Sequence, residues 1–173
     1  MSGSIVYKNI LFCTDFSSDA HMAFVHALDL SRKYKAKLYL LNIIPPQNPC
    51  SFSFETSHTP ISVEKSSNET EQELQQQAHK AMIKHYGNDL DEQDDYEIQV
   101  SIGSPDIQII RFARHFQIDM IILGAQGQPE KDRRIFIRTA GNISKFAPCQ
   151  VIAIRSPMEP YSDMESHYEP IQE

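Results

Sequence analysis

Two glycines, Gly124 and Gly127, follow the apolar run at residues 120–123 (MIIL) and precede a basic segment at residues 131–145. The apolar run is typical of a buried strand, and the basic segment is compatible with a helix. Glycines between a strand and a helix let the main chain approach a ligand, and the amides of a helix's first turn attract anions. The pattern predicts a phosphate-sized loop, although the same glycines can serve simply as turn residues.

A second group of candidates is Cys13, Thr14 and Asp15, which follows a strand-like run at residues 6–12 (VYKNILF). Asp15 is expected at the tip of the next loop, where a carboxylate can contact a ligand or cap the neighbouring turn. Cys13 can be a small buried hydrophobic residue or a reactive thiol. Among the basic residues, Arg133, Arg134 and Arg138 either form charge-assisted hydrogen bonds to phosphate or belong to a solvated helix face.

Sequence motifs that would identify a conventional catalytic or metal site are missing. The chain has no G-x4-GK[ST], GxGxxG or GxSxG pattern, and its histidines lack HExxH or paired Cys/His spacing. No nucleophile is paired with a base. We therefore expect no metal site and a protein that is not an enzyme, with a slow ATPase activity as the least supported alternative.

The elements that must position these residues alternate between strands and helices. This order predicts an α/β fold with a doubly wound, five-stranded, mostly parallel sheet and helices on both faces. Ligands of such sheets bind beyond the carboxyl ends of the strands. The predicted strands span residues 6–12, 36–44, 96–102, 119–123 and 149–154. Four helices are predicted: one of about four turns after Ser17 or Ser18, one at about residues 69–86, one that begins at Pro105, and one at about residues 134–146.

The helix boundaries and buried faces can also be predicted. Ser17 or Ser18 is expected to cap the first helix, and Ser104 the third, where Gly103 ends a strand, Pro105 takes the first helical position and Asp106 suits the dipole. Helical spacing recurs in three segments. It predicts an apolar stripe of Ala23, Ala27, Leu30 and Tyr34 on the first helix. In the second helix the spacing runs through Leu74, Ala78, Ala81, Met82 and His85, and the third helix is expected to bury Ile107, Ile110, Ala113 and Phe116.

Composition limits the class of partner. The chain has 173 residues, a formal net charge of -7 and a hydrophobic fraction of 40%. It therefore lacks the basic surface of a general nucleic-acid or membrane-surface binder. Its three cysteines do not have the spacing of a disulfide framework, and the sequence shows neither a signal-peptide pattern nor an apolar stretch of about 18 residues. We expect a soluble cytoplasmic protein that binds neither nucleic acid nor a membrane.

Two segments fall outside the regular pattern. Residues 47–68 are rich in Ser, Pro, Asn and Thr, and are predicted to form a lid over a site or a flexible insertion. Residues 156–173 combine acidic residues and prolines with no Lys or Arg, which predicts a disordered acidic tail.

Four segments, ILFCTDFS, AKLYLLNII, GSPDIQII and DMIILGAQG, together resemble a universal stress protein domain, in their order and spacing. We assign this domain to residues 1–155. The resemblance implies an adenine-nucleotide alpha hydrolase-like fold and a homodimer paired through the last strand. One branch of the family binds ATP through a G-x2-G-x9-G-[ST] motif after the fourth strand.

Carried over by residue, the resemblance gives Asp15 to the ribose side, Ile43 to adenine, and Leu123, Gly124 and Gly127 to the first half of the glycine motif. In the second half, Ile137 and Arg138 replace the Gly and Ser of the motif. The full predicted binding set is Cys13, Thr14, Asp15, Ile43, Leu123, Gly124, Gln126, Gly127, Arg138 and Thr139.

The departure at Ile137 and Arg138 has two opposite effects. The Ile137 side chain would crowd the phosphates, whereas the Arg138 guanidinium could hydrogen-bond to them. Two readings therefore stay open. One is a non-catalytic stress-response homodimer whose cleft senses ATP, AMP, another adenine nucleotide or a small anion. The other is a ligand-free dimeric interaction protein with a degenerate nucleotide motif.

Overall fold

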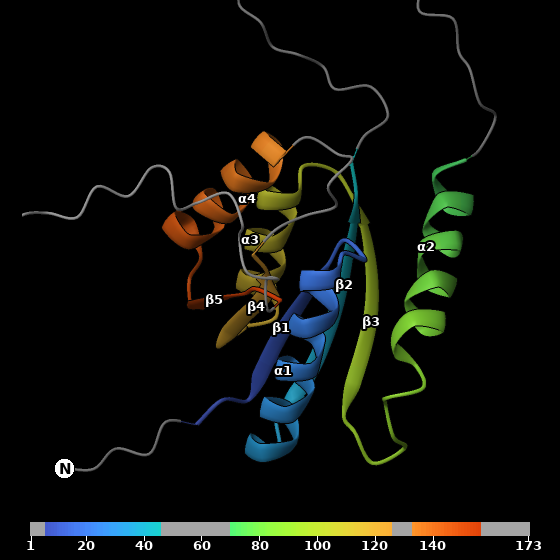
Figure 1. The fold of residues 1–173 in the computed structure, drawn as a ribbon, viewed down its shortest axis with the longest axis vertical. Helices are drawn as coiled ribbons and strands as arrows, with labels where there is room; N and C mark the ends of the chain where they lie inside the picture. Colours follow the sequence, from blue (N-terminus) through green and yellow to red (C-terminus); the bar gives the residue numbers. More distant parts are fainter. Residues whose placement is uncertain (1–5, 46–69, 126–132, 157–173) are drawn as a thin grey trace, which may run out of the picture.

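The computed structural model describes residues 6–45, 70–125 and 133–156, without the side chains of residues 133–138. These segments form strands and helices in alternation, with four helices against one sheet (Figure 1). In chain order the elements are β1 (Asn9–Thr14), α1 (Ser18–Tyr34), β2 (Lys37–Ile44), α2 (Glu71–Tyr86), β3 (Tyr96–Ile102), α3 (Pro105–His115), β4 (Met120–Gly124), α4 (Arg133–Phe146) and β5 (Gln150–Ile154).

The sheet has the strand order β3-β2-β1-β4-β5, and every neighbouring pair is parallel. The predicted α/β fold with a five-stranded sheet is therefore confirmed. β1 lies at the centre, with β2 on one side and β4 on the other. Because the chain leaves β1 in one direction and returns later on the opposite side, β1 and β4 form the switch point of the sheet.

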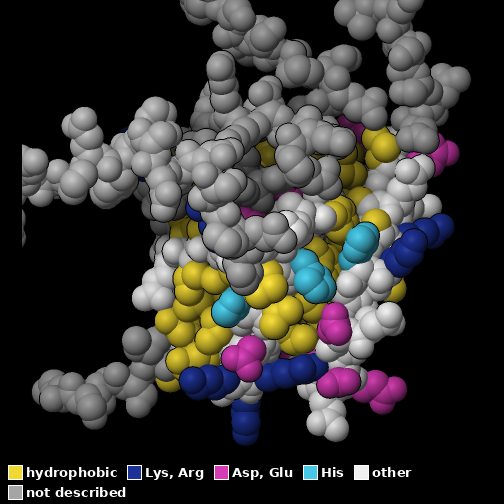
Figure 2. Space-filling model, in the orientation of Figure 1, with side chains coloured by type: hydrophobic (Ala, Val, Ile, Leu, Met, Phe, Trp, Pro, Cys, Tyr) yellow, Lys and Arg dark blue, Asp and Glu magenta, His cyan; other side chains and the backbone are white. Residues whose placement is uncertain are grey.

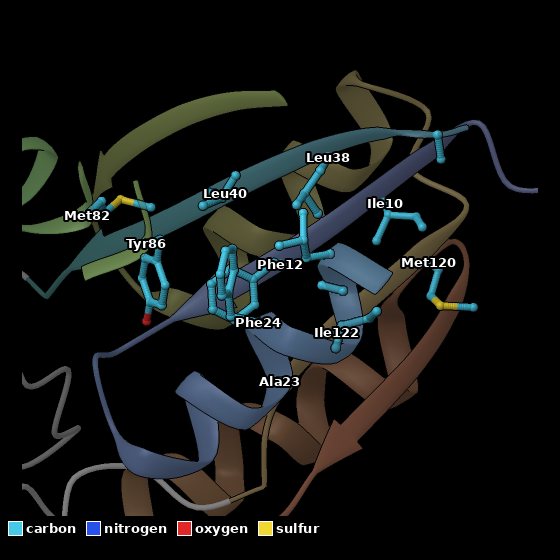
Figure 3. Close-up of a cluster of buried hydrophobic side chains, with 13 residues drawn as sticks. Ile10, Phe12, Ala23, Phe24, Leu38, Leu40, Met82, Tyr86, Met120 and Ile122 are labelled. Carbon is cyan, nitrogen blue, oxygen red and sulfur yellow. The ribbon is translucent and has the colours of Figure 1, made fainter. Parts of the chain in front are cut away.

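Helices cover both faces of the sheet, as predicted. α1 and α2 pack on one face, where Phe12, Phe24, Leu40 and Tyr86 belong to one buried cluster (Figure 3). α3 and α4 pack on the other face through a second cluster that includes Ile143. With both faces covered, the central strands read as continuous apolar runs rather than alternating ones.

The first strand begins three residues later than predicted. The amides of Lys8 and Asn9 donate to the Asp119 carboxylate at 2.7 and 2.9 Å, which fixes the entry to β1. Val6 lies before this point and is 64% exposed. Apolar composition predicted that a strand is present, but its first residue is set by Asp119, which is more than 100 residues away in the chain.

The first helix begins as predicted, with Ser17 as its cap. The Ser17 hydroxyl accepts a hydrogen bond from the Ala20 amide at 3.1 Å. Of the predicted stripe, Ala23 and Ala27 are fully buried. Leu30 and Tyr34 are only partly buried, although both pack against the cluster on this face.

The predicted helical spacing of α2 does not decide which of its last residues is buried. Met82 is buried, but His85 is exposed and Tyr86 is buried in its place. The Tyr86 ring lies 4.6 Å from the Phe24 ring and 5.3 Å from the Phe12 ring, centroid to centroid. The aromatic ring buries more apolar surface than an imidazole would, so the helix turns Tyr86 toward the sheet.

The start of α3 is confirmed in part. Gly103 has φ 143°, where a side chain would be strained, and Pro105 takes the first turn. The Ser104 hydroxyl, however, makes no capping bond to the helix and instead donates to Asp106 at 2.6 Å. Ile107 was predicted to be buried but is 55% exposed, because the helix turns Ile109 toward the sheet.

A cluster of charges joins the end of α1 to the loop before β3. Arg32 forms ion pairs with Asp94 at 2.7 Å and Asp91 at 2.9 Å, and it also donates to the Asp89 carbonyl. Basic and acidic side chains gather at this end of the molecule in Figure 2. The predicted insertion at residues 47–68 and the tail beyond Ser156 lie outside the described residues.

Candidate functional site

The register of the sheet brings two groups of predicted site residues together. Cys13 of β1 pairs with Leu123 of β4, so that both strands end at the same edge. Thr14 is the last residue of β1 and Asp15 follows it, while Gly124 is the last residue of β4. The candidate site is therefore the carboxyl edge at the switch point, which is where ligands of open α/β sheets bind.

Thr14 is buried and is held by hydrogen bonds to Tyr86, Phe16 and the side chain of Asn42. Its hydroxyl lies 2.5 Å from the Tyr86 hydroxyl and accepts a bond from the Phe16 amide at 3.0 Å. Its carbonyl accepts a bond from the Asn42 side chain at 2.9 Å. Strand β2 and helix α2 thus hold the end of β1 through side chains, in addition to the main-chain pairing of Thr14 with Asn42.

Asp15 is half-buried at the tip of the loop. One carboxylate oxygen accepts a bond from the Ser17 amide at 3.0 Å, so the capping role considered for this residue is present. Phe16 next to it has φ 62°, an uncommon conformation for an aromatic residue. The loop is therefore a fixed, strained turn that holds the Asp15 carboxylate at the sheet edge.

Gly124 is explained by the packing of α1. A Cβ atom at this position would lie 2.7 Å from the Ala20 amide nitrogen and 2.8 Å from the Asp19 carbonyl carbon. Both atoms are main chain and cannot move aside without shifting the helix. The first turn of α1 consequently lies directly against the end of β4. The part of Gly124 in ligand binding stays a prediction.

The end of β5 also reaches this region. The Ala125 amide donates to the Ile154 carbonyl at 2.6 Å, and the Ser156 amide donates to the buried Asp19 carboxylate at 2.9 Å. Asp19 lies in the first turn of α1, where a negative charge suits the helix dipole. In the structure the Asp19 carboxylate also holds the main chain just after β5, through its bond with the Ser156 amide.

Cys13, Ile43 and Leu123 share the face covered by α3 and α4. Cys13 and Leu123 are buried, whereas Ile43 is half-buried near the carboxyl end of β2. Burial raises the pKa of the Cys13 thiol, and burial likewise raises the pKa of Cys149 to about 11. Both thiols are free and are poor nucleophiles near neutral pH.

The remaining predicted residues are placed only in part. Thr139 is half-buried on α4, one turn before Asn142, whose side chain donates to Asp106 at 2.7 Å. Gln126 and Gly127 lie outside the described residues, as does the side chain of Arg138. The question raised by Ile137 and Arg138 is therefore untested.

Two residues at this edge were missed by sequence reasoning, Tyr86 and Asn42. Both are polar and buried, and both bond to Thr14. An Asn within the apolar run of residues 36–44 was a usable signal, because a buried amide requires a partner. Tyr86 had no comparable signal, since its partner lies 72 residues earlier.

Other kinds of site were sought among the described residues. Within them no group of three His, Cys, Asp or Glu side chains could hold a metal ion. The described helices also include none with both the length and the apolar character required to cross a bilayer. A shallow groove of about 440 Å³ lies between α2 and β3, away from the switch point.

Comparison with known proteins gives a consistent picture. A model of the universal stress protein family matches residues 6–155. A protein of Staphylococcus haemolyticus assigned to the universal stress proteins is 28% identical over 153 residues, which cover 88% of this chain and 87% of the relative. The structure of the universal stress protein UspA from Lactobacillus plantarum is 25% identical with a TM-score of 0.58, covering 88% of this chain and all of that one.

Two further structures of similar fold were solved with nucleotides. The universal stress protein of Archaeoglobus fulgidus in complex with dAMP is 15% identical with a TM-score of 0.55, covering 87% of this chain and 99% of that one. A universal stress protein in complex with cAMP is 15% identical with a TM-score of 0.57, covering 87% and 98%. The family match spans most of the sequence, and the chain belongs to the universal stress protein family.

Proposed function

We propose that this protein is a non-catalytic stress-response homodimer that binds an adenine nucleotide, ATP or AMP, at the carboxyl edge between β1 and β4. The observation that carries the proposal is the pairing of Cys13 with Leu123, which brings the Asp15 loop and the Gly124 turn to one edge. Family members of similar fold have been solved with dAMP and cAMP, which supports an adenine nucleotide as the ligand.

The residues at this edge fit the parts of a nucleotide. The half-buried Ile43 offers apolar surface to a base, and the Asp15 carboxylate offers an acceptor to ribose hydroxyls. In this proposal the main chain at Gly124 and Gly127 lies near the phosphates, with Arg138 and Thr139 contributing from α4. None of these groups is a nucleophile with a base, so binding rather than turnover is proposed.

Calorimetry with ATP, ADP and AMP at millimolar concentration tests the proposal. Because the chain has no tryptophan, copurified nucleotide is also easy to detect, as a raised ratio of adenine absorbance to protein absorbance in the purified sample. Asp15→Asn keeps an oxygen that can accept from the Ser17 amide but removes the charge, and should weaken binding severalfold. Asp29→Asn, an exposed change on α1, is the matched control and should bind like the wild type.

Absence of heat with all three nucleotides, together with no copurified nucleotide, would show the proposal to be wrong. Release of phosphate from ATP above the buffer rate, abolished in Asp15→Asn, would contradict the non-catalytic part alone. The two parts of the proposal are therefore separable in one set of samples.

A second candidate, a dimeric interaction protein without a ligand, is favoured by one observation. Gly124 is fully accounted for by its contact with α1, so a nucleotide is not needed to explain that glycine. Under this reading Gly127→Val should leave thermal stability and partner pull-downs unchanged. A loss of partner binding in Gly127→Val, restored by Gly127→Ala, would count against the second candidate.

The proposed homodimer forms through β5, at one edge of the sheet. The Ile154 carbonyl bonds toward β4, and main-chain groups alternate in direction along a strand. The amides and carbonyls of Val151 and Ala153 therefore point away from the sheet. An apolar edge strand whose outer main-chain groups have no partner among the described residues is a liability, and pairing with a second copy removes it.

A further inference from the structure

We infer that Tyr86 is a positioning residue for the Asp15 loop, holding through Thr14 the carboxylate that contacts the ribose. The inference rests on the proposed nucleotide binding at this edge and adds a residue of α2 that lies outside the predicted binding set. Tyr86 is the last residue of α2, and its hydroxyl lies 2.5 Å from the Thr14 hydroxyl.

The ring and the hydroxyl of Tyr86 have separate tasks. The ring packs against Phe12 and Phe24 in the buried cluster, and Figure 3 shows the hydroxyl directed away from these two rings. The ring would pack equally well as Phe. The hydroxyl needs a polar partner because it is almost completely buried, and Thr14 supplies it.

From Thr14 the constraint passes directly to the loop. The Thr14 hydroxyl accepts from the Phe16 amide at 3.0 Å, so the residues on both sides of Asp15 belong to one hydrogen-bonded unit. The Phe16 ring also lies nearly parallel to the Tyr86 ring, at 13° and a centroid distance of 6.3 Å. Tyr86 thus contacts the two neighbours of Asp15, one by its hydroxyl and the other by its ring.

This arrangement accounts for the strained backbone at Phe16. An aromatic residue at φ 62° is costly and persists only where surrounding contacts hold it. Here the amide of Phe16 is held by Thr14 and its ring by Tyr86. The Asp15 carboxylate is consequently preorganised, so little ordering remains to be done when a ligand binds.

The test uses Tyr86→Phe and two ligands, AMP and 2′,3′-dideoxyadenosine monophosphate, which lacks the ribose hydroxyls. Tyr86→Phe removes one neutral hydrogen bond, the bond to Thr14, and we expect it to weaken AMP binding roughly fivefold. Because the effect acts through Asp15, affinity for the dideoxy nucleotide should stay unchanged. The preference for AMP over the dideoxy nucleotide should therefore fall by the same roughly fivefold factor. If Tyr86→Phe only loosened the structure in general, the binding of both ligands would weaken equally.

Two further variants make the result specific. Thr14→Val removes the hydroxyl that bonds both to Tyr86 and to the Phe16 amide, so it should weaken AMP binding at least as much as Tyr86→Phe does. Adding Tyr86→Phe to Thr14→Val should cause no further loss of AMP affinity. Tyr7→Phe is the matched control, since it removes a hydroxyl that donates to Gln150 at 2.9 Å, outside the candidate site. Tyr7→Phe should leave both affinities at the wild-type value.

The possible outcomes separate this inference from the proposed function. If the wild type binds AMP but Tyr86→Phe keeps the full preference over the dideoxy nucleotide, the positioning role is wrong and nucleotide binding stands. Equal weakening of both ligands overturns the positioning role in the same way. If the wild type binds neither ligand, the proposed function fails and the inference fails with it.

Discussion

The α-carbon of Gly124 faces the first turn of α1 so closely that a Cβ atom there would lie 2.7 Å from the Ala20 amide nitrogen. This contact joins the end of β4 to the start of the helix that follows β1. The Ser17 cap and the Asp19 carboxylate belong to the same turn. The closeness of Gly124 and Ala20 therefore fixes the geometry of the switch point.

Gly124→Ala is expected to destabilise the protein by about 1–3 kcal/mol, because the added methyl group forces main-chain atoms apart. Urea denaturation monitored by circular dichroism measures the change in the free energy of unfolding. The matched control is Gly141→Ala on α4, where a Cβ atom has no neighbour within 4 Å. In that helix alanine should stabilise by about 0.5–1 kcal/mol. Equal stability of the two variants would refute the packing role of Gly124.

Asn142→Ala should destabilise the protein in a pH-dependent manner. Burial acts to raise the pKa of Asp106, but hydrogen bonds from Ser104, Asn142 and the Ile107 amide outweigh burial and lower it. Because the folded-state pKa is lowered, this stabilisation is present above the unfolded pKa of about 3.9 and is lost as pH falls through the folded pKa. The destabilisation should be about 1 kcal/mol near neutral pH and smaller near pH 3.

Urea denaturation at the two pH values measures this difference, and Ser144→Ala, an exposed change on the same helix, is the control. A destabilisation by Asn142→Ala that does not change with pH would mean that its contact with Asp106 is not the cause.

Tyr86 should ionise later than an ordinary tyrosine. Burial of the phenol is the main cause of its raised pKa; the nearby Asp15 carboxylate raises it further, and the bond to Thr14 opposes both. A raised folded-state pKa stabilises the fold below the unfolded value of about 10, and this contribution is lost as pH rises through the folded pKa. The alkaline titration of the tyrosinate band should therefore contain a late component that Tyr86→Phe lacks.

The chain has seven tyrosines and no tryptophan, so indole does not contribute to this absorbance band. In urea, where burial is lost, the tyrosines of both proteins should titrate together near pH 10, at about the reference value. Superimposable curves for the two folded proteins would show that the Tyr86 phenol is not protected.

Ala153→Pro should convert the proposed homodimer to a monomer. The Ala153 amide points away from β4, so proline removes a donor from the free edge and leaves the pairing within the sheet intact. Sedimentation velocity at micromolar concentration measures the change, and Ala153→Ser, which keeps the amide, should remain dimeric. A wild-type protein that sediments as a monomer would refute the pairing altogether.

Local signals in the sequence predicted the elements well. The series from Gly103 to Asp106 places the start of α3 correctly, since glycine, proline and an acidic residue each act within one turn. The Ser17 cap has the same local origin. The predicted span of residues 96–102 coincides with β3, where the acidic turn before it and Gly103 after it limit the strand.

Features that depend on distant residues could not be predicted. Ile107 and Ile109 are equally apolar, and only the position of the sheet decides which one is buried. The bond between Thr14 and Tyr86 joins residues 72 positions apart. Gly124 was interpreted through its neighbour Gly127, while the atoms that require a glycine belong to Asp19 and Ala20.

The central position of β1 also constrains how the chain folds as it is synthesised. β1 leaves the ribosome first and can pair with β2 at once, yet its other partner, β4, begins more than 100 residues later. At translation rates of about 5–20 residues per second, that gap lasts roughly 5–20 s. Throughout this interval the strand that carries Cys13 and leads to Asp15 has one open, apolar edge. Synthesis of β4 is what allows this edge to be covered.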